Sequence, residues 1–254
     1  MDLGLTGANA LITGASRGIG FAIATQLVAE GANVAICGRD ENQLAEAAEK
    51  LTTQGPGRVH ATPVDVSDAD QINRWVTSAA DDLAGLDIVV SNVSGMGGPG
   101  LEAWERNFRI DVLGFHHLMV AAHPHLQKSS RASVIALGTT AATETFGDPT
   151  VAYGSLKAAL IHQISGYAQK WAGEGIRCNA VSPGPVLFEG GAWDTVRTNN
   201  PEMFERILGM IPRGSMASPQ EIASVVTFLS SPAASIITGV NVVADGGFTK
   251  MVKF

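Results

Sequence analysis

The stretch ANALITGASRGIGFAIATQLV, residues 8–28, decides the fold because three local patterns follow one another in it. Residues 8–13 form a short apolar run typical of a buried strand. A turn containing Gly14, Gly18 and Gly20 comes next, and residues 21–28 have apolar positions at helical spacing. A strand that runs through a glycine turn into a helix predicts the first unit of a parallel α/β sheet.

The glycine turn, Gly14–Gly20, is expected to bind a ligand. Glycines let a ligand approach the backbone closely, and the N–H groups of a helix N-terminus attract negative charge. We therefore predict a pyrophosphate site here. The spacing is Gly-x-x-x-Gly-x-Gly rather than the commoner Gly-x-Gly-x-x-Gly. A tight turn without a ligand is the alternative, and the strand–turn–helix context favours the pyrophosphate.

Strand-like and helix-like runs alternate along the rest of the chain, which predicts a parallel sheet covered by helices on both faces. The expected later strands are 34–37, 59–63, 86–90, 133–137, 177–181 and 240–243, and the expected helices are 41–53, 69–83, 101–126, 152–172 and 219–230. Residues 186–217 break the alternation and are interpreted as an insertion over the site. We expect one doubly wound, Rossmann-like α/β domain over residues 1–254, without repeats or a linker.

The composition restricts the partners and the location of the protein. Charged residues are only 16% of the 254, against roughly 25% in an average soluble domain, so extensive burial in a core or between subunits is expected. The net charge of −7 argues against nucleic acid as a partner. No apolar run has the length of a membrane span, and Cys37 and Cys178 lie in apolar strand patterns. These features predict buried free thiols in a cytoplasmic protein without a membrane partner.

Tyr153 and Lys157 are four residues apart in a predicted helix, which places a phenol and an ammonium on one face. A neighbouring cation favours the phenolate form of a tyrosine, so such a pair suits proton transfer to an alkoxide or from an alcohol. A surface tyrosine beside a solvated lysine is the alternative. The other motifs of the chain favour the catalytic interpretation.

Five motifs in the right order resemble the short-chain dehydrogenase/reductase family. They are Thr13–Gly20, Asp65-Val66, Tyr153 with Lys157, Asn179–Gly184, and the segment from Thr238-Gly239 to Asp245-Gly246-Gly247. The resemblance implies hydride transfer between a nicotinamide cofactor and a carbonyl or secondary alcohol. It also implies a homo-oligomer, most often a tetramer. A sparsely charged helix over 152–172, with Lys157 and Lys170 as its charges, supports such an assembly.

The resemblance assigns catalytic roles to four residues. Tyr153 is the expected general acid/base, and Lys157 promotes its ionisation and binds the cofactor ribose. Thr140, thirteen residues before Tyr153, takes the place of the family's serine and would polarise the carbonyl, with Thr139 a weaker candidate. Asp111 stands where the family has an asparagine that helps to hold a proton-relay water. A modified relay and a purely structural aspartate are both open.

The resemblance also implies a set of cofactor-binding residues: Gly14, Ser16, Arg17, Gly18, Ile19, Gly20, Arg39, Asp65, Val66, Asn92, Tyr153, Lys157, Pro183, Gly184 and Val186. The second strand ends at Gly38, so no carboxylate is present to bond the ribose hydroxyls. Arg17 and Arg39 supply two guanidinium groups that suit a 2′-phosphate. We therefore expect NADP, with solvated loop arginines as the alternative.

Two departures from the family pattern affect the site. Ser91-Asn92-Val93-Ser94 retains only Asn92 of the family's Asn-Asn-Ala-Gly, and Phe188 stands where a threonine usually bonds the carboxamide. Val186 is expected to contact the nicotinamide through its backbone. The insertion also carries apolar residues that would form either a lid over an apolar substrate, which is the favoured hypothesis, or their own small core: Leu187, Phe188, Trp193, Met203, Phe204, Ile207, Leu208 and Met210.

Other functions remain as alternatives. His116, His117, His123 and His125 are interpreted as packing or interface residues, because no cysteine or acidic residue follows at metal-ligand spacing; we expect no metal site. A nucleotide-binding regulatory or structural protein with weak turnover is one alternative function. A dehydratase or epimerase on the same scaffold is the other.

Overall fold

A seven-stranded, fully parallel sheet forms the centre of the molecule in this computed structural model, which describes residues 2–145 and 151–251. The strands are β1 (Asn9–Thr13), β2 (Asn33–Gly38), β3 (Val59–Pro63), β4 (Ile88–Ser91), β5 (Ser133–Leu137), β6 (Arg177–Pro183) and β7 (Asn241–Ala244). Their order across the sheet is β3-β2-β1-β4-β5-β6-β7. All seven predicted strands are confirmed.

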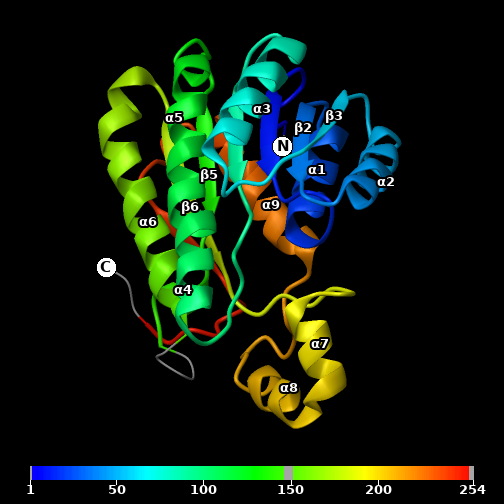
Figure 1. The fold of residues 1–254 in the computed structure, drawn as a ribbon, viewed down its shortest axis with the longest axis vertical. Coiled ribbons are helices and arrows are strands. Elements are labelled where there is room, and N and C mark those ends of the chain that lie inside the picture. Colours follow the sequence, from blue (N-terminus) through cyan, green and yellow to red (C-terminus); the bar gives the residue numbers. More distant parts are fainter. Residues whose placement is uncertain (1, 146–150, 252–254) are drawn as a thin grey trace.

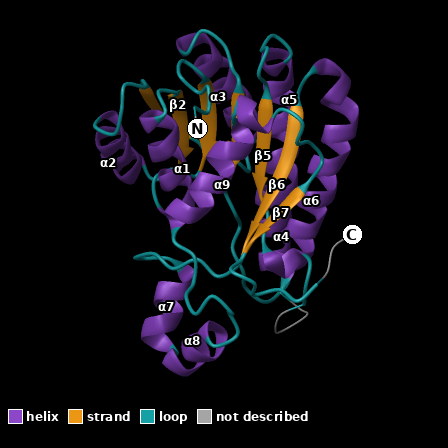
Figure 2. Ribbon diagram, turned by 180° about the vertical axis from the view of Figure 1, so that it is seen from behind, coloured by secondary structure: helices purple, strands orange, loops and turns teal. Residues whose placement is uncertain are grey.

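Helices cover both faces of this sheet, as expected for a parallel sheet that must be buried on each side (Figures 1 and 2). Helices α1 (Gly18–Ala29), α2 (Glu41–Thr52) and α9 (Pro219–Ser230) pack with one apolar cluster. Helices α3 (Ala69–Asp82), α5 (Gly114–Leu126) and α6 (Ala152–Trp171) pack with the other. The predicted doubly wound, Rossmann-like architecture is confirmed.

The side chains of β2 contribute alternately to the apolar clusters on the two faces of the sheet. Val34 and Ile36 belong to the cluster with α1 and α9, whereas Ala35 and Cys37 belong to the cluster with α3 and α5. Alternate side chains of a strand point to opposite faces, so a strand buried on both sides is a continuous apolar run. The edge strand β3 is the contrast, because its residues 61–63 are exposed.

The helix predicted over 101–126 is confirmed as one continuous helical stretch, but its winding changes in the middle. It consists of α4 (Leu101–Asn107), a π-helical segment η1 (Phe108–Leu113) and then α5, which follow one another without a gap. The chain is closely packed where η1 passes into α5. A Cβ on Gly114 would lie 2.6 Å from the Val66 carbonyl oxygen, so the chain passes here with no space for a side chain. Wide π-helical turns of this kind occur frequently at functional sites.

The insertion, residues 186–217, lies beyond the carboxyl ends of the strands (Figure 1). It contains α7 (Ala192–Asn199) and α8 (Pro201–Leu208), and it begins with a bridge between Val186 and Ala217. Phe204, Ile211 and Met216 form a small core of its own together with Phe248 from the C-terminal segment. The small-core interpretation therefore describes most of its apolar residues.

Candidate active site

The predicted site residues gather at the carboxyl ends of β1, β4, β5 and β6. The chain connections run in opposite directions from β1 and β4, so a crevice opens between the ends of these two neighbouring strands. Open parallel sheets bind their ligands at such a switch point. The glycine turn follows β1 at this place, and Asn92 follows β4.

The backbone of the glycine turn has dihedral angles that only glycine adopts easily. Gly14 has φ +66° and Gly18 has φ +58°, both in the left-handed region. A Cβ on Gly20 would collide with the Gly14 carbonyl oxygen and with the Asn92 amide. Glycine at these positions avoids strain and collision at the start of α1.

Asn92 holds this turn in place. Its side-chain Nδ2 donates to the carbonyl oxygens of Thr13 at 3.1 Å and Gly14 at 3.0 Å, while its backbone N–H donates to the Thr13 hydroxyl at 2.9 Å. The structure thus gives Asn92 a supporting role for the turn. Its predicted contact with the cofactor stays a prediction.

The N-terminus of α1 fits a phosphate group. Arg17 occupies the N-cap without capping the helix through its side chain, and the first turn contains no acidic residue. Uncapped N–H groups at a helix start attract anions. The ring of Phe188 closes this place from the insertion side, because a Cβ on Gly18 would lie 2.6 Å from its Cζ atom.

The end of β2 lies beside the glycine turn. Ser16 Oγ lies 3.6 Å from the place that a Cβ on Gly38 would take. Arg17 belongs to the same turn, and its Nη1 donates to the Gly190 carbonyl oxygen at 3.1 Å. Arg39 is exposed. The region holds two arginines and no carboxylate at Gly38, which is the charge pattern expected of a 2′-phosphate site.

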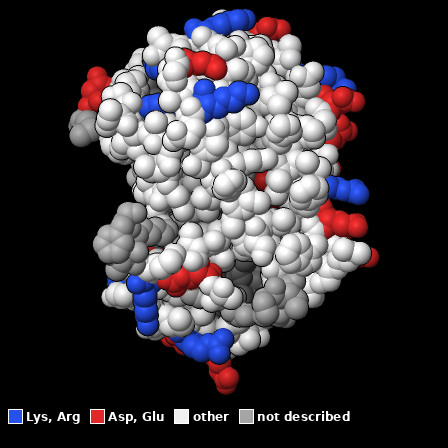
Figure 3. All heavy atoms as spheres, turned by 90° about the vertical axis from the view of Figure 1, so that its left-hand side faces the viewer, with Lys and Arg blue, Asp and Glu red and all other residues white. Residues whose placement is uncertain are grey.

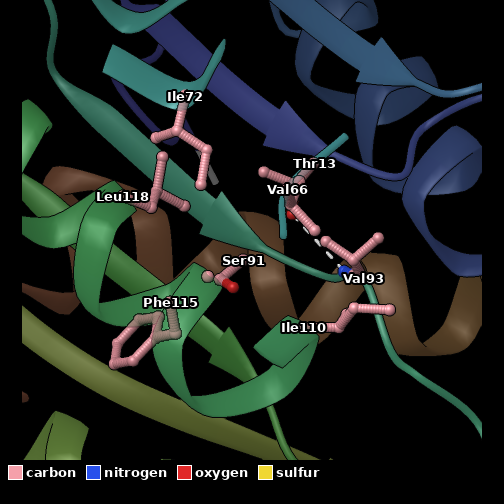
Figure 4. Close-up of a pocket in the computed structure, with 9 residues that line it drawn as sticks. Thr13, Val66, Ile72, Ser91, Val93, Ile110, Phe115 and Leu118 are labelled. Atoms are coloured by element: carbon pink, nitrogen blue, oxygen red, sulfur yellow. Dashed lines mark hydrogen bonds between the residues drawn. The ribbon is translucent and has the colours of Figure 1, made fainter. Parts of the chain in front are cut away.

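Val66 follows β3, and its side chain lies beside the carboxyl end of β4. Figure 4 shows its side chain close to those of Val93 and Ile110, around a narrow hollow that has no room for a water molecule. Asp65 precedes it, and its Oδ1 accepts hydrogen bonds from the backbone N–H and the hydroxyl of Ser67. The carboxylate is thereby fixed at the rim of the crevice.

Tyr153 and Lys157 lie one turn apart near the start of α6, as predicted. The tyrosine is half-buried and the lysine side chain is only 2% exposed. Lys157 Nζ donates to the carbonyl oxygens of Leu137 at 2.9 Å and Val93 at 3.3 Å. The ammonium is therefore held between the ends of β4 and β5, so the alternative of a solvated surface lysine is wrong.

Asp111 lies within η1 and reaches this ammonium. Its Oδ1 is 3.0 Å from Lys157 Nζ, and its side chain is completely buried. Its Oδ2 accepts from the backbone N–H of Gly95 at 3.0 Å. Asp111 thus joins Lys157 to the loop after β4.

Thr140 starts the short helix η2 (Thr140–Ala142) after β5. The neighbouring Thr139 hydroxyl caps this helix by accepting from the Ala141 N–H, whereas the buried Thr140 hydroxyl makes no hydrogen bond within the described part of the chain. A Cβ on Gly154 would collide with the Ala141 carbonyl oxygen. This close packing brings the first turn of α6, with Tyr153, against the turn that carries Thr140.

Pro183 ends β6, and the chain continues through Gly184 toward the insertion. A Cβ on Gly184 would lie 2.8 Å from the Asp245 Cβ, so this passage also has no space for a side chain. Val186 is buried, and the following residue, Leu187, is bonded through its N–H to the Ala217 carbonyl oxygen. The segment lies at the same end of the sheet as Tyr153.

Groups outside the crevice have structural partners. His116 lies 3.0 Å from the Tyr167 hydroxyl, and His123 stacks on Trp171 and pairs with Glu174. Across residues 2–145 and 151–251, no group of three or more histidine, cysteine or acidic residues is arranged to hold a metal. Burial raises the pKa of the Cys37 and Cys178 thiols to about 12.

Known proteins match this chain over almost its full length. A family profile described as enoyl-(acyl carrier protein) reductase, of the short-chain alcohol dehydrogenase type, matches residues 14–249. Isoepoxydon dehydrogenase from Penicillium expansum is 39% identical over 257 residues, covering 100% of this chain and 99% of the relative. The chain belongs to the short-chain dehydrogenase/reductase family. It is thus an oxidoreductase of that family.

Solved structures of short-chain dehydrogenases/reductases agree with the fold. L-Sorbose reductase from Gluconobacter frateurii, complexed with NADPH and L-sorbose, superimposes with a TM-score of 0.90 at 28% identity, covering 99% of this chain and 100% of that chain. An NADP complex of RhlG from Pseudomonas aeruginosa gives a TM-score of 0.88 at 32% identity, covering 97% of this chain and 98% of that chain.

Three features of the site were missed by the sequence analysis. Arg106 clamps the loop after β4, donating to the carbonyl oxygens of Gly95 and Gly97 at 3.0 and 2.9 Å. Asp111 pairs directly with Lys157, and Arg17 is bonded to Gly190. Each contact joins residues far apart in the chain or on different elements, so no local spacing signals it.

Proposed function

We propose that this protein is an NADP(H)-dependent carbonyl reductase and alcohol dehydrogenase. The observation that carries the proposal is the placement of Tyr153, on the first turn of α6, one turn from the buried Lys157 and against the turn that carries Thr140. A proton donor, a cation and a free hydroxyl at the carboxyl end of a parallel sheet suit the polarisation and protonation of a carbonyl oxygen.

The residues have distinct roles in the proposed reduction. The Thr140 hydroxyl donates a hydrogen bond to the substrate oxygen, and Tyr153 gives its proton to the same oxygen as the C–H bond forms. NADPH, when bound, supplies the hydride, which brings the two electrons that convert the carbonyl into an alcohol. Lys157 supplies positive charge beside the phenol. Oxidation of an alcohol is the same sequence reversed.

The cofactor would lie along the crevice from the glycine turn to Tyr153. Gly14, Gly18 and Gly20 would leave room for the phosphates, Ser16 and Ile19 would border them, and Asn92 supports the turn. Asp65 and Val66 would border the adenine, while Pro183, Gly184 and Val186 would border the nicotinamide. Arg17 and Arg39 would bind the 2′-phosphate, and Gly38 offers no competing carboxylate. The neighbours complexed with NADPH or NADP support this choice.

The substrate class follows from the insertion. Its Phe188 ring packs against Gly18 of the glycine turn, and an apolar side chain at this place favours a substrate with an apolar surface next to its carbonyl or alcohol. The relative named isoepoxydon dehydrogenase supports a small secondary alcohol. We propose that part of the insertion acts as a lid, even though most of its apolar side chains pack with one another.

We also propose that the protein forms a homo-oligomer, most simply a tetramer. Figure 3 shows the face over α5 and α6, whose middle is nearly free of charged side chains. The exposed residues of α6 are mostly small or uncharged: Ser155, His162, Ser165, Gly166 and Gln169, with Lys170 at the end. None of the described helices is long and apolar enough to cross a bilayer. A cytoplasmic location remains a prediction.

A direct assay tests the proposed activity. The purified protein is incubated with ketones and secondary alcohols of graded size and polarity, each with NADH, NADPH or the oxidised forms, and the absorbance of reduced nicotinamide is followed. Turnover that prefers NADPH and is lost in Tyr153→Phe supports the proposal. Tight cofactor binding without turnover on any substrate would favour a regulatory role instead.

A further inference from the structure

Asp111 and Lys157 form an ion pair that is sealed from solvent. Their Oδ1 and Nζ atoms are 3.0 Å apart, and the two side chains are 0% and 2% exposed. The directed hydrogen bonds of the ammonium go to Leu137 and Val93, and Asp111 Oδ1 receives none within the described chain. The contact is therefore a charge interaction, which is strong because the surroundings are buried.

The local structure fixes the carboxylate in this place. Asp111 lies in the π-helical turn η1, and its second oxygen is occupied by the N–H of Gly95. The guanidinium of Arg106 holds the carbonyl oxygens on both sides of Met96, which itself has φ +60°. A non-glycine residue in the left-handed region is retained only where its surroundings hold it.

The other charged groups near the pair are engaged elsewhere or lie outward. The elements that pack against η1 carry these titratable or charged residues: Glu102, Glu105 and Arg106 on α4, Arg109 on η1 itself, His116, His117, His123 and His125 on α5, and Tyr153, Lys157, His162, Tyr167 and Lys170 on α6. Among the described residues, Lys157 is the ion-pair partner of Asp111.

We infer that Asp111 is a positioning residue that acts through Lys157: it fixes the ammonium between β4 and β5 and offsets the field of that ammonium at Tyr153. A lone cation beside a phenol favours the phenolate, which accepts a proton and so promotes alcohol oxidation. A carboxylate in contact with that cation opposes the effect. The effect of this coupling on turnover rests on the proposed function, whereas the charge coupling to Tyr153 does not.

The coupling can be measured without cofactor or substrate. The chain has only two tyrosines, Tyr153 and Tyr167, so Tyr167→Phe leaves Tyr153 as the sole source of tyrosinate absorbance. In that background, Asp111→Asn removes the negative charge but keeps an oxygen to accept from Gly95. We expect the tyrosinate titration to move to lower pH.

A matched control separates this effect from general destabilisation. Asp87 also forms an ion pair, 3.4 Å from Arg131, but it precedes β4 at the opposite end of the strand. Asp87→Asn removes the same charge and should leave the tyrosinate titration unchanged. A titration that is unmoved by Asp111→Asn, or moved equally by Asp87→Asn, overturns the inference.

Kinetics then test whether this coupling affects turnover. Asp111→Asn should move the pH profile of alcohol oxidation to lower pH, with the cofactor KM little changed. If Asp111→Asn does not fold, Asp111→Ser takes its place; it also removes the charge, so its tyrosinate titration should move to lower pH too, and an unmoved titration would contradict the inference. Absence of turnover in the wild type together with a shifted titration would refute the proposed function alone.

Discussion

The guanidinium of Arg17 donates a hydrogen bond to the carbonyl oxygen of Gly190, with 3.1 Å between Nη1 and the oxygen. The two residues are 173 positions apart in the chain, and the bond ties the glycine turn to the insertion. Phe188, two residues earlier, packs against Gly18 of the same turn. The glycine turn and the insertion are thus in direct contact, and this bond engages one nitrogen of the guanidinium.

We expect NADPH to be preferred over NADH by at least about tenfold in kcat/KM. A charge-assisted bond to a phosphate contributes roughly 1.5–3 kcal/mol, and both Arg17 and Arg39 can provide one. The measurement is kcat/KM with each cofactor on a single substrate. Equal use of the two cofactors would show that neither arginine binds a 2′-phosphate.

The double substitution Gly38→Asp with Arg39→Ala should reverse this preference. The structure has room for the new side chain, because a Cβ on Gly38 has no neighbour nearer than 3.6 Å. The aspartate would bond the ribose hydroxyls and repel a phosphate. Arg74→Ala removes an exposed arginine from α3 and should leave the cofactor ratio as it is. Retention of the NADPH preference in the double variant would contradict the assignment.

Tyr153→Phe should lower kcat by roughly 10²- to 10⁴-fold, the usual contribution of general acid/base catalysis. The ring packing is preserved, so the dissociation constant of the cofactor, measured by fluorescence quenching, should change little. Tyr167→Phe is the matched control, since it removes the other phenol of the chain on the same helix. Near-normal turnover in Tyr153→Phe would eliminate the proposed mechanism.

Gly166→Arg should disrupt the proposed oligomer. A Cβ at Gly166 has no neighbour within 4 Å in the single chain, so the larger side chain fits the protomer. It would place a charge on the uncharged face of α6, where a partner is proposed to pack. Light scattering should show a larger assembly for the wild type and for the control Gln54→Arg, and a smaller one for Gly166→Arg. A monomeric wild type would refute the assembly.

Glu221→Gln should weaken the fold only above acidic pH. The Arg213 guanidinium and the Ser218 N–H lower the pKa of Glu221 from 4.5 to about 2. Because the folded pKa is the lower one, the stabilisation is complete above pH 4.5 and disappears as the pH falls toward about 2. Glutamine keeps an oxygen for the Ser218 N–H at the N-terminus of α9.

Urea unfolding of Glu221→Gln and the wild type at several pH values checks this expectation. The two midpoints should differ near neutral pH and converge below pH 4.5. The carboxylate is 48% exposed, so added salt should reduce the difference. Glu46→Gln on α2 controls for the change in net charge. A difference that is constant with pH would mean that the ion pair does not stabilise the fold.

The sheet could be predicted from the sequence because it depends on local patterns. Each strand is a short apolar run, and the glycine turn identifies where the first one ends. The π-helical winding inside the helix predicted over 101–126 could not be found in this way. It depends on the fit of Gly114 against Val66 and on Asp111 reaching Lys157, which are contacts between distant parts of the chain.

The sequence could predict which residues belong to the site, but not the hydrogen bonds and ion pair that connect them. The spacing of Tyr153 and Lys157 fixes their common helix face, and the structure adds that the lysine is enclosed by Leu137, Val93 and Asp111. Burial of a charged group depends on what folds over it. For the same reason, the supporting bonds of Asn92 and the Arg17–Gly190 contact were not foreseen.

The two buried cysteines have a practical consequence. Their thiolate forms are suppressed at neutral pH, since burial holds both pKa values near 12, and thiol reagents attack the thiolate. The two native cysteines should therefore not react with thiol-directed labels, so an introduced cysteine can be labelled selectively. A single cysteine introduced at exposed Met210 in the insertion would carry a fluorophore, and a second label on α2 would report by energy transfer whether the insertion moves when cofactor is added.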